Sequence, residues 1–152
     1  MCSIIIISGG QTGVDQGAMD YALDHRIPCG GYCPKNRISE SGKIPDKYPL
    51  TELNSDKYFY RTEKNVIASD GTLIIEDQNQ LGEGTRDTIQ LCIKHFKPYQ
   101  ILNVNSDLLS KQDFTSWLES EKIKVLNVAG NRESQSPGIQ EKTYSILNKL
   151  LK

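Results

Sequence analysis

The sequence predicts an α/β fold with three layers, in which about five mainly parallel strands are covered by helices on both faces. Short apolar runs alternate along the chain with segments whose apolar residues recur at helical spacing, which is the pattern of strand–helix–strand units. The first run, Ile4–Ile7, has four consecutive β-branched residues and suits a strand buried on both faces. Glycine-rich turns stand between several strands and the helices that follow. We therefore expect parallel strands joined by right-handed crossovers.

The first strand leads into a glycine turn and a helix. The turn, Ser8–Gly13, precedes Val14 and Ala18, which recur at helical spacing. The first N–H groups of a helix have no partner within it, and the helix dipole adds positive potential there. We therefore predict that Gly10–Gly13 bind a phosphate, and that a bulky residue at Gly13 abolishes binding while leaving the fold largely intact. The alternative is that the glycines only allow a tight turn.

This turn matches neither of two common nucleotide-binding motifs. Ser8 stands where the dinucleotide motif has its first glycine, and Gly30–Lys35, after the second strand, has no acid placed to hold a ribose. No Gly-Lys-Ser or Gly-Lys-Thr follows Gly13, as a P-loop requires. The pattern indicates a phosphate site without identifying its ligand.

The chain then continues the alternation of strands and helices. A short strand is expected at Cys29–Tyr32, followed by a long irregular loop, Pro34–Pro49. Internal loops of this length often cover a site. Lys35, Arg37 and Lys43 could close over an anion or form solvated surface.

A helix is predicted between residues 55 and 70, with a polar stripe at Tyr58, Thr62 and Asn65. This stripe either faces a site or lies exposed. The elements expected after it are a strand at Gly71–Glu76, a helix stopped by Pro98, a strand at Tyr99–Val104, a helix after Ser110, a strand at Lys124–Ala129 and a last helix.

Two helices carry more detailed expectations. Ser136 is predicted as the N-cap of the last helix, with Pro137 at its first position. The core face of the helix before Pro98 is predicted from its apolar spacing as Ile89, Cys92, Ile93 and Phe96.

Three loops at the carboxyl edge of the predicted sheet combine glycine with polar residues. They are Gly9–Gly13, Gly82–Thr85 and Gly130–Gly138, and all three precede helices. Ligands of open parallel sheets bind beyond this edge. Because turn geometry alone does not account for glycines in three loops of one edge, we predict a small-molecule site there.

Composition narrows the class of protein. The 152 residues correspond to one domain, 1–152, and the net charge of −1 is spread without a basic stripe, so nucleic acid and membrane surfaces are not expected partners. The first apolar run is too short for a signal peptide or a membrane span, and we expect a cytoplasmic protein. Cys2 and Cys92 are expected as core thiols. Cys29 and Cys33 match no zinc or redox motif, and Cys33 is expected near the mouth of the site.

Four stretches resemble a known family. They are I-S-G-G-Q-T-G-V-D (Ile7–Asp15), I-P-C-G-G-Y-C-P-K (Ile27–Lys35), R-T-E-K-N-V (Arg61–Val66) and L-N-V-A-G-N-R-E-S (Leu126–Ser134). In these the sequence resembles the molybdenum cofactor carrier protein family, a Rossmann-like group related to the lysine-decarboxylase-like phosphoribohydrolases. The resemblance implies a Rossmann-like fold, a homo-oligomer (dimer or tetramer), and a protein that carries, stores or protects molybdenum cofactor (molybdopterin), a pterin with a terminal phosphate. Molybdenum-cofactor enzymes or biosynthetic proteins are the implied partners.

One departure from the hydrolase relatives bears on activity. They carry P-G-G-x-G-T-x-x-E, whose final Glu does acid–base chemistry. In the matching stretch, Leu81–Thr88, Thr88 takes its place, and threonine exchanges no proton usefully near neutral pH. We therefore predict binding rather than catalysis, with no catalytic residue. The alternative, a phosphoribohydrolase-like enzyme acting on nucleoside monophosphates, would take its carboxylate from Asp15 or Glu133.

The loops and the resemblance together predict the groups that hold the ligand. The phosphate is assigned to the first glycine turn, with a second nest in the loop after the third strand. Asp15, Glu133 or Asp77 could accept hydrogen bonds from the pterin, although Asp15 could equally serve to complement the helix dipole. Arg132 either pairs with an oxyanion or holds Glu133. The predicted ligand-binding residues, none of them a metal ligand, are Gly9, Gly10, Gln11, Thr12, Gly13, Asp15, Lys35, Gly82, Gly84, Thr85, Asn131, Arg132, Glu133 and Ser134.

Overall fold

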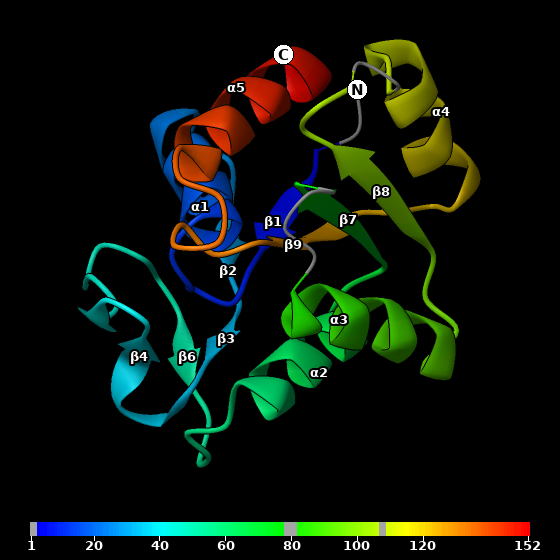
Figure 1. The fold of residues 1–152 in the computed structure, drawn as a ribbon. Helices are drawn as coiled ribbons and strands as arrows, with labels where there is room; N and C mark the ends of the chain where they lie inside the picture. Colours follow the sequence, from blue (N-terminus) through cyan, green and yellow to red (C-terminus); the bar gives the residue numbers. More distant parts are fainter. Residues whose placement is uncertain (1–2, 78–81, 107–108) are drawn as a thin grey trace.

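The computed structural model describes residues 3–77, 82–106 and 109–152, and it confirms the α/β fold (Figure 1). The strands of its central sheet are β1 (Ile5–Ile7), β2 (Cys29–Gly30), β7 (Gly71–Glu76), β8 (Tyr99–Asn103) and β9 (Val125–Gly130). They lie in the order β2, β1, β9, β7, β8, and each neighbouring pair is parallel. The predicted parallel sheet is confirmed.

Helices cover both faces of this sheet, as Figure 1 shows. On one face Phe114 packs in a core with Leu73 and Val128 of the sheet. On the other face Val66 packs with Cys92 in a smaller core. The first face carries α1 (Val14–Asp24), α4 (Lys111–Ser120) and α5 (Ile139–Leu151), and the second carries α2 (Tyr58–Ala68) and α3 (Glu83–Lys94).

Side chains alternate along β9, and this decides what faces the second helix layer. Leu126 and Val128 belong to the core beneath α1 and α5, so Asn127 and Ala129 face α2 and α3. The side-chain amide of Asn127 donates to the hydroxyl of Thr72, on the neighbouring strand, at 3.2 Å. This side of β9 is therefore a partly polar wall.

The place of β9 between β1 and β7 makes the turn after β1 a neighbour of the loop after β9. The N–H of Val14 donates to the carbonyl oxygen of Asn131 at 3.1 Å. Gly13 has a φ of +84°, and a Cβ added to it would lie 2.5 Å from the oxygen of Asn131 and 2.6 Å from the nitrogen of Glu133. Gly13 is therefore required by the packing of these two loops.

The segment expected as one irregular loop folds into small elements of its own. Gly31, with a φ of +128°, interrupts the predicted strand at Cys29–Tyr32. The elements that follow are β3 (Tyr32–Cys33), which pairs with β6 (Thr51–Glu52), β4 (Ile38–Ser39), which pairs with β5 (Gly42–Lys43), and a short 3-10 helix, η1 (Lys35–Arg37).

Arg37 holds this segment together. Its guanidinium donates hydrogen bonds of 2.7 to 3.4 Å to backbone carbonyl oxygens of Ile44, Pro45, Tyr48 and Leu50. Ile44 and Tyr48 are buried against Met19 and Cys33. Arg37 is thus a structural group, and not the anion ligand that the sequence left open. Lys43 pairs with Asp46 at 3.1 Å.

The predicted core face of α3 was partly wrong. Cys92 is buried, together with Leu91, but Ile93 is 60% exposed and Phe96 is 95% exposed. The helix ends at Lys94, and Phe96 follows in a turn with a φ of +55°. Helical spacing therefore does not extend to Phe96.

The predicted start of the last helix was also wrong. Gly138, and not Ser136, is the N-cap of α5. The Ser136 hydroxyl instead donates to the Asp77 carboxylate at 2.9 Å. The carboxylate of Glu133 accepts the N–H groups of Gly138 at 2.6 Å and Gln140 at 3.1 Å, so a glutamate from the preceding loop satisfies the start of the helix.

We expect Gly13→Ala to lower the free energy of unfolding by about 1–3 kcal/mol or more, because it adds a side chain at positive φ against backbone atoms of the next loop. The sequence-based expectation that the fold tolerates a bulky residue here held only if φ permits a side chain, and the φ of +84° does not favour one. Gly84→Ala is the matched control, since nothing lies within 4 Å of its Cβ position and alanine favours a helix. Urea unfolding followed by circular dichroism measures both variants. A Gly13→Ala protein as stable as the control would contradict this account.

Candidate functional site

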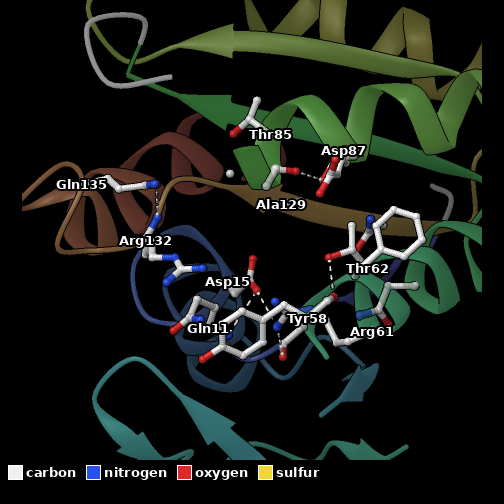
Figure 2. A pocket seen from close by; sticks show the side chains of 17 residues that line it. Gln11, Asp15, Tyr58, Arg61, Thr62, Thr85, Asp87, Ala129, Arg132 and Gln135 are labelled. Carbon is white, nitrogen blue, oxygen red and sulfur yellow. Dashed lines mark hydrogen bonds and ion pairs between the residues drawn. The ribbon is translucent and has the colours of Figure 1, made fainter. Parts of the chain in front are cut away.

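A cavity of about 350 Å³ opens at the carboxyl edge of the sheet, between β9, α2 and the start of α3. Figure 2 shows Thr85 and Asp87 of α3 on one side of it, and Asp15 and Tyr58 on the other. Its volume lies in the range of small-molecule pockets. The predicted ligand residues that line it are Gly9, Gln11, Asp15, Gly84, Thr85 and Arg132. The lining residues outside that prediction are Tyr58, Phe59, Arg61, Thr62, Asn65, Asp87, Thr88, Asn127, Ala129, Gly130 and Gln135.

A buried ion pair forms part of the wall. Arg61 Nη1 lies 3.7 Å from Asp15 Oδ2, and the two side chains are 9% and 11% exposed. The same nitrogen donates to the carbonyl oxygen of Gly9 at 2.8 Å, while Asp15 Oδ2 accepts the N–H of Gln11 at 3.1 Å. The pair therefore joins α1, the glycine turn and α2.

The electrostatics of this pair are those of a dry site. Burial raises the pKa of the Asp15 carboxyl, and the charge of Arg61 and the N–H of Gln11 offset only part of that rise. Burial also lowers the pKa of Arg61, which still stays protonated near neutral pH. Removing such charges from water costs several kcal/mol per ion. Ionisable groups held in a cleft at this cost are typical of functional sites.

Tyr58 lies between two guanidinium groups. The Cζ atom of Arg61 is 5.3 Å from the centroid of its ring, and that of Arg132 is 5.2 Å away. Each such cation–π contact contributes about 0.5–1 kcal/mol at an exposed site. Asp15 neutralises the charge of Arg61 within this wall, whereas the side chain of Arg132 is 37% exposed and lies 3.9 Å from Glu40. The guanidinium of Arg132 can bind a phosphate through two parallel hydrogen bonds.

The first turns of α3 form the opposite wall. Gly84 and Thr85 lie at the positive end of the helix, where the first N–H groups have no partner within the helix. Asp87 is half-buried and lines the cavity. The hydroxyl of Thr88 donates to the carbonyl oxygen of Gly84 at 2.8 Å. The residue that replaces the glutamate of the hydrolases is thus bonded within its own helix.

The glycine turn predicted to bind phosphate uses several of its N–H groups internally. Asp15 accepts the N–H of Gln11, the side-chain oxygen of Gln11 accepts the N–H of Thr12 at 3.0 Å, and Asn131 accepts that of Val14. These N–H groups are engaged within the protein. The cationic groups that line the cavity are instead the guanidinium of Arg61, which is paired with Asp15, and that of Arg132.

Several predicted ligand residues lie outside the cavity lining. Gly10 faces Leu50 and Ile44, Gly13 faces the loop after β9, and Gly82 faces Gln135. Thr12 and Ser134 donate to Glu40. Asn131 accepts the N–H of Asp77 at 2.8 Å, Glu133 caps α5, and Lys35 is exposed on η1. Apart from Lys35, these residues pack or bond the loops around the cavity.

The three cysteines in the described ranges, Cys29, Cys33 and Cys92, do not line the cavity. Cys92 is buried as predicted, and Cys33, expected near the mouth of the site, is buried with Met19 and Ile44. Cys2 lies outside the described residues.

Sequence reasoning identified part of α2. Its polar stripe does face the site, because Tyr58, Thr62 and Asn65 all line the cavity. Asn65 has a second task, since its amide binds the backbone N–H and carbonyl oxygen of Tyr32 at 2.9 and 3.0 Å. Arg61 was missed, because an arginine on an amphipathic helix is usually solvated. Its place in R-T-E-K-N-V was the one available signal.

The sequence and the fold of this chain are similar to those of known proteins. A family model described as the circularly permutated YpsA SLOG family matches residues 6–151. The chain is also similar to a solved structure from Syntrophus aciditrophicus SB, named "putative molybdenum carrier protein". The two share 40% sequence identity over 99% of this chain and 97% of the other, with a TM-score of 0.92. No curated protein matches. Within the described ranges, no helix is long and apolar enough to cross a membrane.

We expect Asp15→Asn to lower the free energy of unfolding by about 3–5 kcal/mol, because it leaves the charge of Arg61 buried without a counter-ion. Asp56→Asn, at an exposed position, is the control. Combining Asp15→Asn with Arg61→Met should restore part of the loss, since the unpaired charge is then gone. Denaturant unfolding of the wild type, Asp15→Asn, Arg61→Met and the double variant gives the coupling energy. A loss below about 1 kcal/mol in the single variant would show that the pair is not the structural link described.

Proposed function

The chain belongs to the circularly permutated YpsA SLOG family, and we propose that it is a carrier that binds molybdenum cofactor, a phosphorylated pterin, in the cavity between α2, α3 and β9. The observation that carries the proposal is the convergence of Arg61 and Arg132 on one wall, opposite the start of α3. The name of the solved relative supports a molybdenum-related carrier role.

The groups around the cavity fit the parts of such a ligand. The guanidinium of Arg132 can donate charge-assisted hydrogen bonds to the phosphate. The first N–H groups of α3 can donate to acceptor atoms of the pterin. The side-chain nitrogen of Gln11 is buried and has no hydrogen-bond partner among the described residues. Its orientation is fixed, because the side-chain oxygen of Gln11 accepts the N–H groups of Thr12 and Glu40, both at 3.0 Å. This buried donor belongs to a residue that lines the cavity, and a polar group of a ligand would satisfy it.

We assign the amide and amino edge of the pterin to Asp87. The carboxylates suggested by the sequence, Asp15, Glu133 and Asp77, are each engaged with groups of the protein. Asp87 lines the cavity from α3, across from the arginine wall. A carboxylate there can accept two N–H groups of a pterin ring.

The alternative, a phosphoribohydrolase-like enzyme, is not favoured. Thr88 cannot serve as the acid or base, and Asp15 is paired with Arg61 inside the protein. Incubation with nucleoside monophosphates should therefore release no free base. Turnover near about 1 s⁻¹, at the low end for ordinary enzymes, would favour the hydrolase instead.

The proposal also covers the location of the protein, its oligomeric state and its partners. We place the carrier in the cytoplasm as a single domain, where the free thiols of Cys29, Cys33 and Cys92 stay reduced. We also propose that it forms a homo-oligomer, and the exposed apolar side chains Ile93 and Phe96 at the end of α3 support self-association. Its partners would be the proteins that make or use the cofactor.

We expect Arg132→Gln to weaken binding of the phosphorylated pterin by about tenfold to a hundredfold, because a charge-assisted hydrogen bond contributes about 1.5–3 kcal/mol. Arg86→Gln removes the same charge from an exposed position of α3 that does not line the cavity. Calorimetric titration of both variants measures the difference. Equal affinities in the two would place the phosphate away from Arg132.

We also expect the phosphate to matter more than any thiol. Cys33→Ser should keep most of the affinity, because Cys33 is buried in the small core around Tyr48 and does not line the cavity. A dephosphorylated pterin should bind more weakly by several kcal/mol, since it loses the charged contacts. If Cys33→Ser costs more affinity than dephosphorylation, the thiol would have to be a direct ligand of the molybdenum.

A further inference from the structure

The tip of the β4–β5 hairpin places a carboxylate among hydrogen-bond donors from two other loops. Glu40 Oε2 accepts the Thr12 hydroxyl and, at 3.1 Å, the N–H of Ser134. Glu40 Oε1 accepts the Ser134 hydroxyl at 2.5 Å and lies 3.9 Å from Arg132 Nη1. Two hydroxyls, one N–H and one guanidinium thus converge on a single carboxylate.

This set of donors is suited to an oxyanion in general. Phosphate oxygens accept hydrogen bonds from hydroxyls, backbone N–H groups and arginine, as a carboxylate does. Partial burial alone would raise the pKa of Glu40, but the hydrogen bonds from Ser134 and Thr12 and the charge of Arg132 lower it below its ordinary value. The site therefore stabilises a negative charge.

The site adjoins the cavity. Arg132 belongs to both, since it lies near Glu40 and also lines the cavity. Gln11, another lining residue, accepts the backbone N–H of Glu40 at 3.0 Å. An anionic group at the edge of a bound ligand would meet the same donors that Glu40 uses.

The hairpin is anchored at its base and held at its tip by Glu40. At the base, Ile44 and Tyr48 are buried and Arg37 bonds the surrounding backbone. In the described part of the chain, the hydrogen bonds and ion pairs that join residues 39–43 to the turns after β1 and β9 all involve Glu40. Release of this one residue would free the tip while the base stays folded.

We propose that Glu40 is an internal competitor that occupies the oxyanion subsite of Thr12, Ser134 and Arg132, and that the phosphate of the ligand displaces it and opens the hairpin tip. The inference rests on the proposed function in one respect, that the displacing oxyanion belongs to the ligand. The subsite itself can be tested with inorganic phosphate alone.

The test titrates inorganic phosphate into ¹⁵N-labelled wild type, Glu40→Ala and Glu40→Gln, and follows the backbone amide of Ser134 by NMR. Glu40→Ala should bind phosphate at least tenfold more tightly than wild type, with the Ser134 amide shifting on saturation. Glu40→Gln keeps a neutral acceptor on the hairpin, and its affinity for phosphate should lie between those of wild type and Glu40→Ala. Asp46→Asn removes one charge from an exposed site of the same segment, and its affinity for phosphate should stay within twofold of that of wild type.

Equal phosphate affinity in wild type and both Glu40 variants would overturn the proposal, as would tighter binding that leaves the Ser134 amide unmoved. Should Glu40→Ala fail to fold, Glu40→Gln decides the matter alone. A second arm uses phosphorylated and dephosphorylated pterin. The Glu40 variants should bind the phosphorylated form more tightly and the dephosphorylated form unchanged. Equal affinity of the phosphorylated pterin for wild type and all variants would contradict displacement of Glu40 by the ligand. If the phosphorylated pterin binds none of these proteins, the proposed function is contradicted, while the result with inorganic phosphate still tests the subsite.

Discussion

The buried pair of Asp15 and Arg61 is the interaction on which the site depends. It joins the start of α1, the turn after β1 and the middle of α2, which come from distant parts of the chain. A buried ion pair is weak evidence for stability, because desolvation offsets most of the attraction. Its place in a cavity wall gives it another use, since Arg61 contacts the ring of Tyr58, and Tyr58 in turn contacts Arg132, the cation that can bind a ligand anion.

Most of the fold could be predicted from the sequence, because its signals are local. The apolar run Ile4–Ile7 and the mostly apolar stretch Lys124–Ala129 predicted strands of the parallel sheet, and helical spacing predicted helices between the strands. The strand order could not be predicted, since no local pattern shows that β9 pairs with both β1 and β7. That order decides which loops meet. The end of α3 was predicted wrongly because a local pattern extended too far. Phe96 fits the helical spacing, although the helix ends at Lys94.

The sequence located the loops that surround the site, but it did not identify all the residues that line the cavity. Glycine content located the three loops, but Gly10 and Gly13 serve loop packing, while Gly9 and Gly84 line the cavity. Composition cannot separate these roles, because a glycine required by loop packing and a glycine that lines a cavity are the same letter in the sequence. Arg61 and Asp87 carry charge into the cavity from helices, where charged residues usually face water, and Glu40 reaches the loops from a hairpin that the sequence did not indicate. Only tertiary structure shows these placements.

The central claim is that a phosphorylated pterin binds between the arginine wall and the start of α3. Amide chemical-shift mapping of ¹⁵N-labelled protein with such a pterin tests it most directly. The account predicts saturable shifts at Gly84, Thr85 and Arg132, while amides on α4, such as Trp117, stay unchanged. Shifts confined to the second hollow, beside Asp20 and Tyr144 at the start of α5, with none at Thr85 or Arg132, would contradict it.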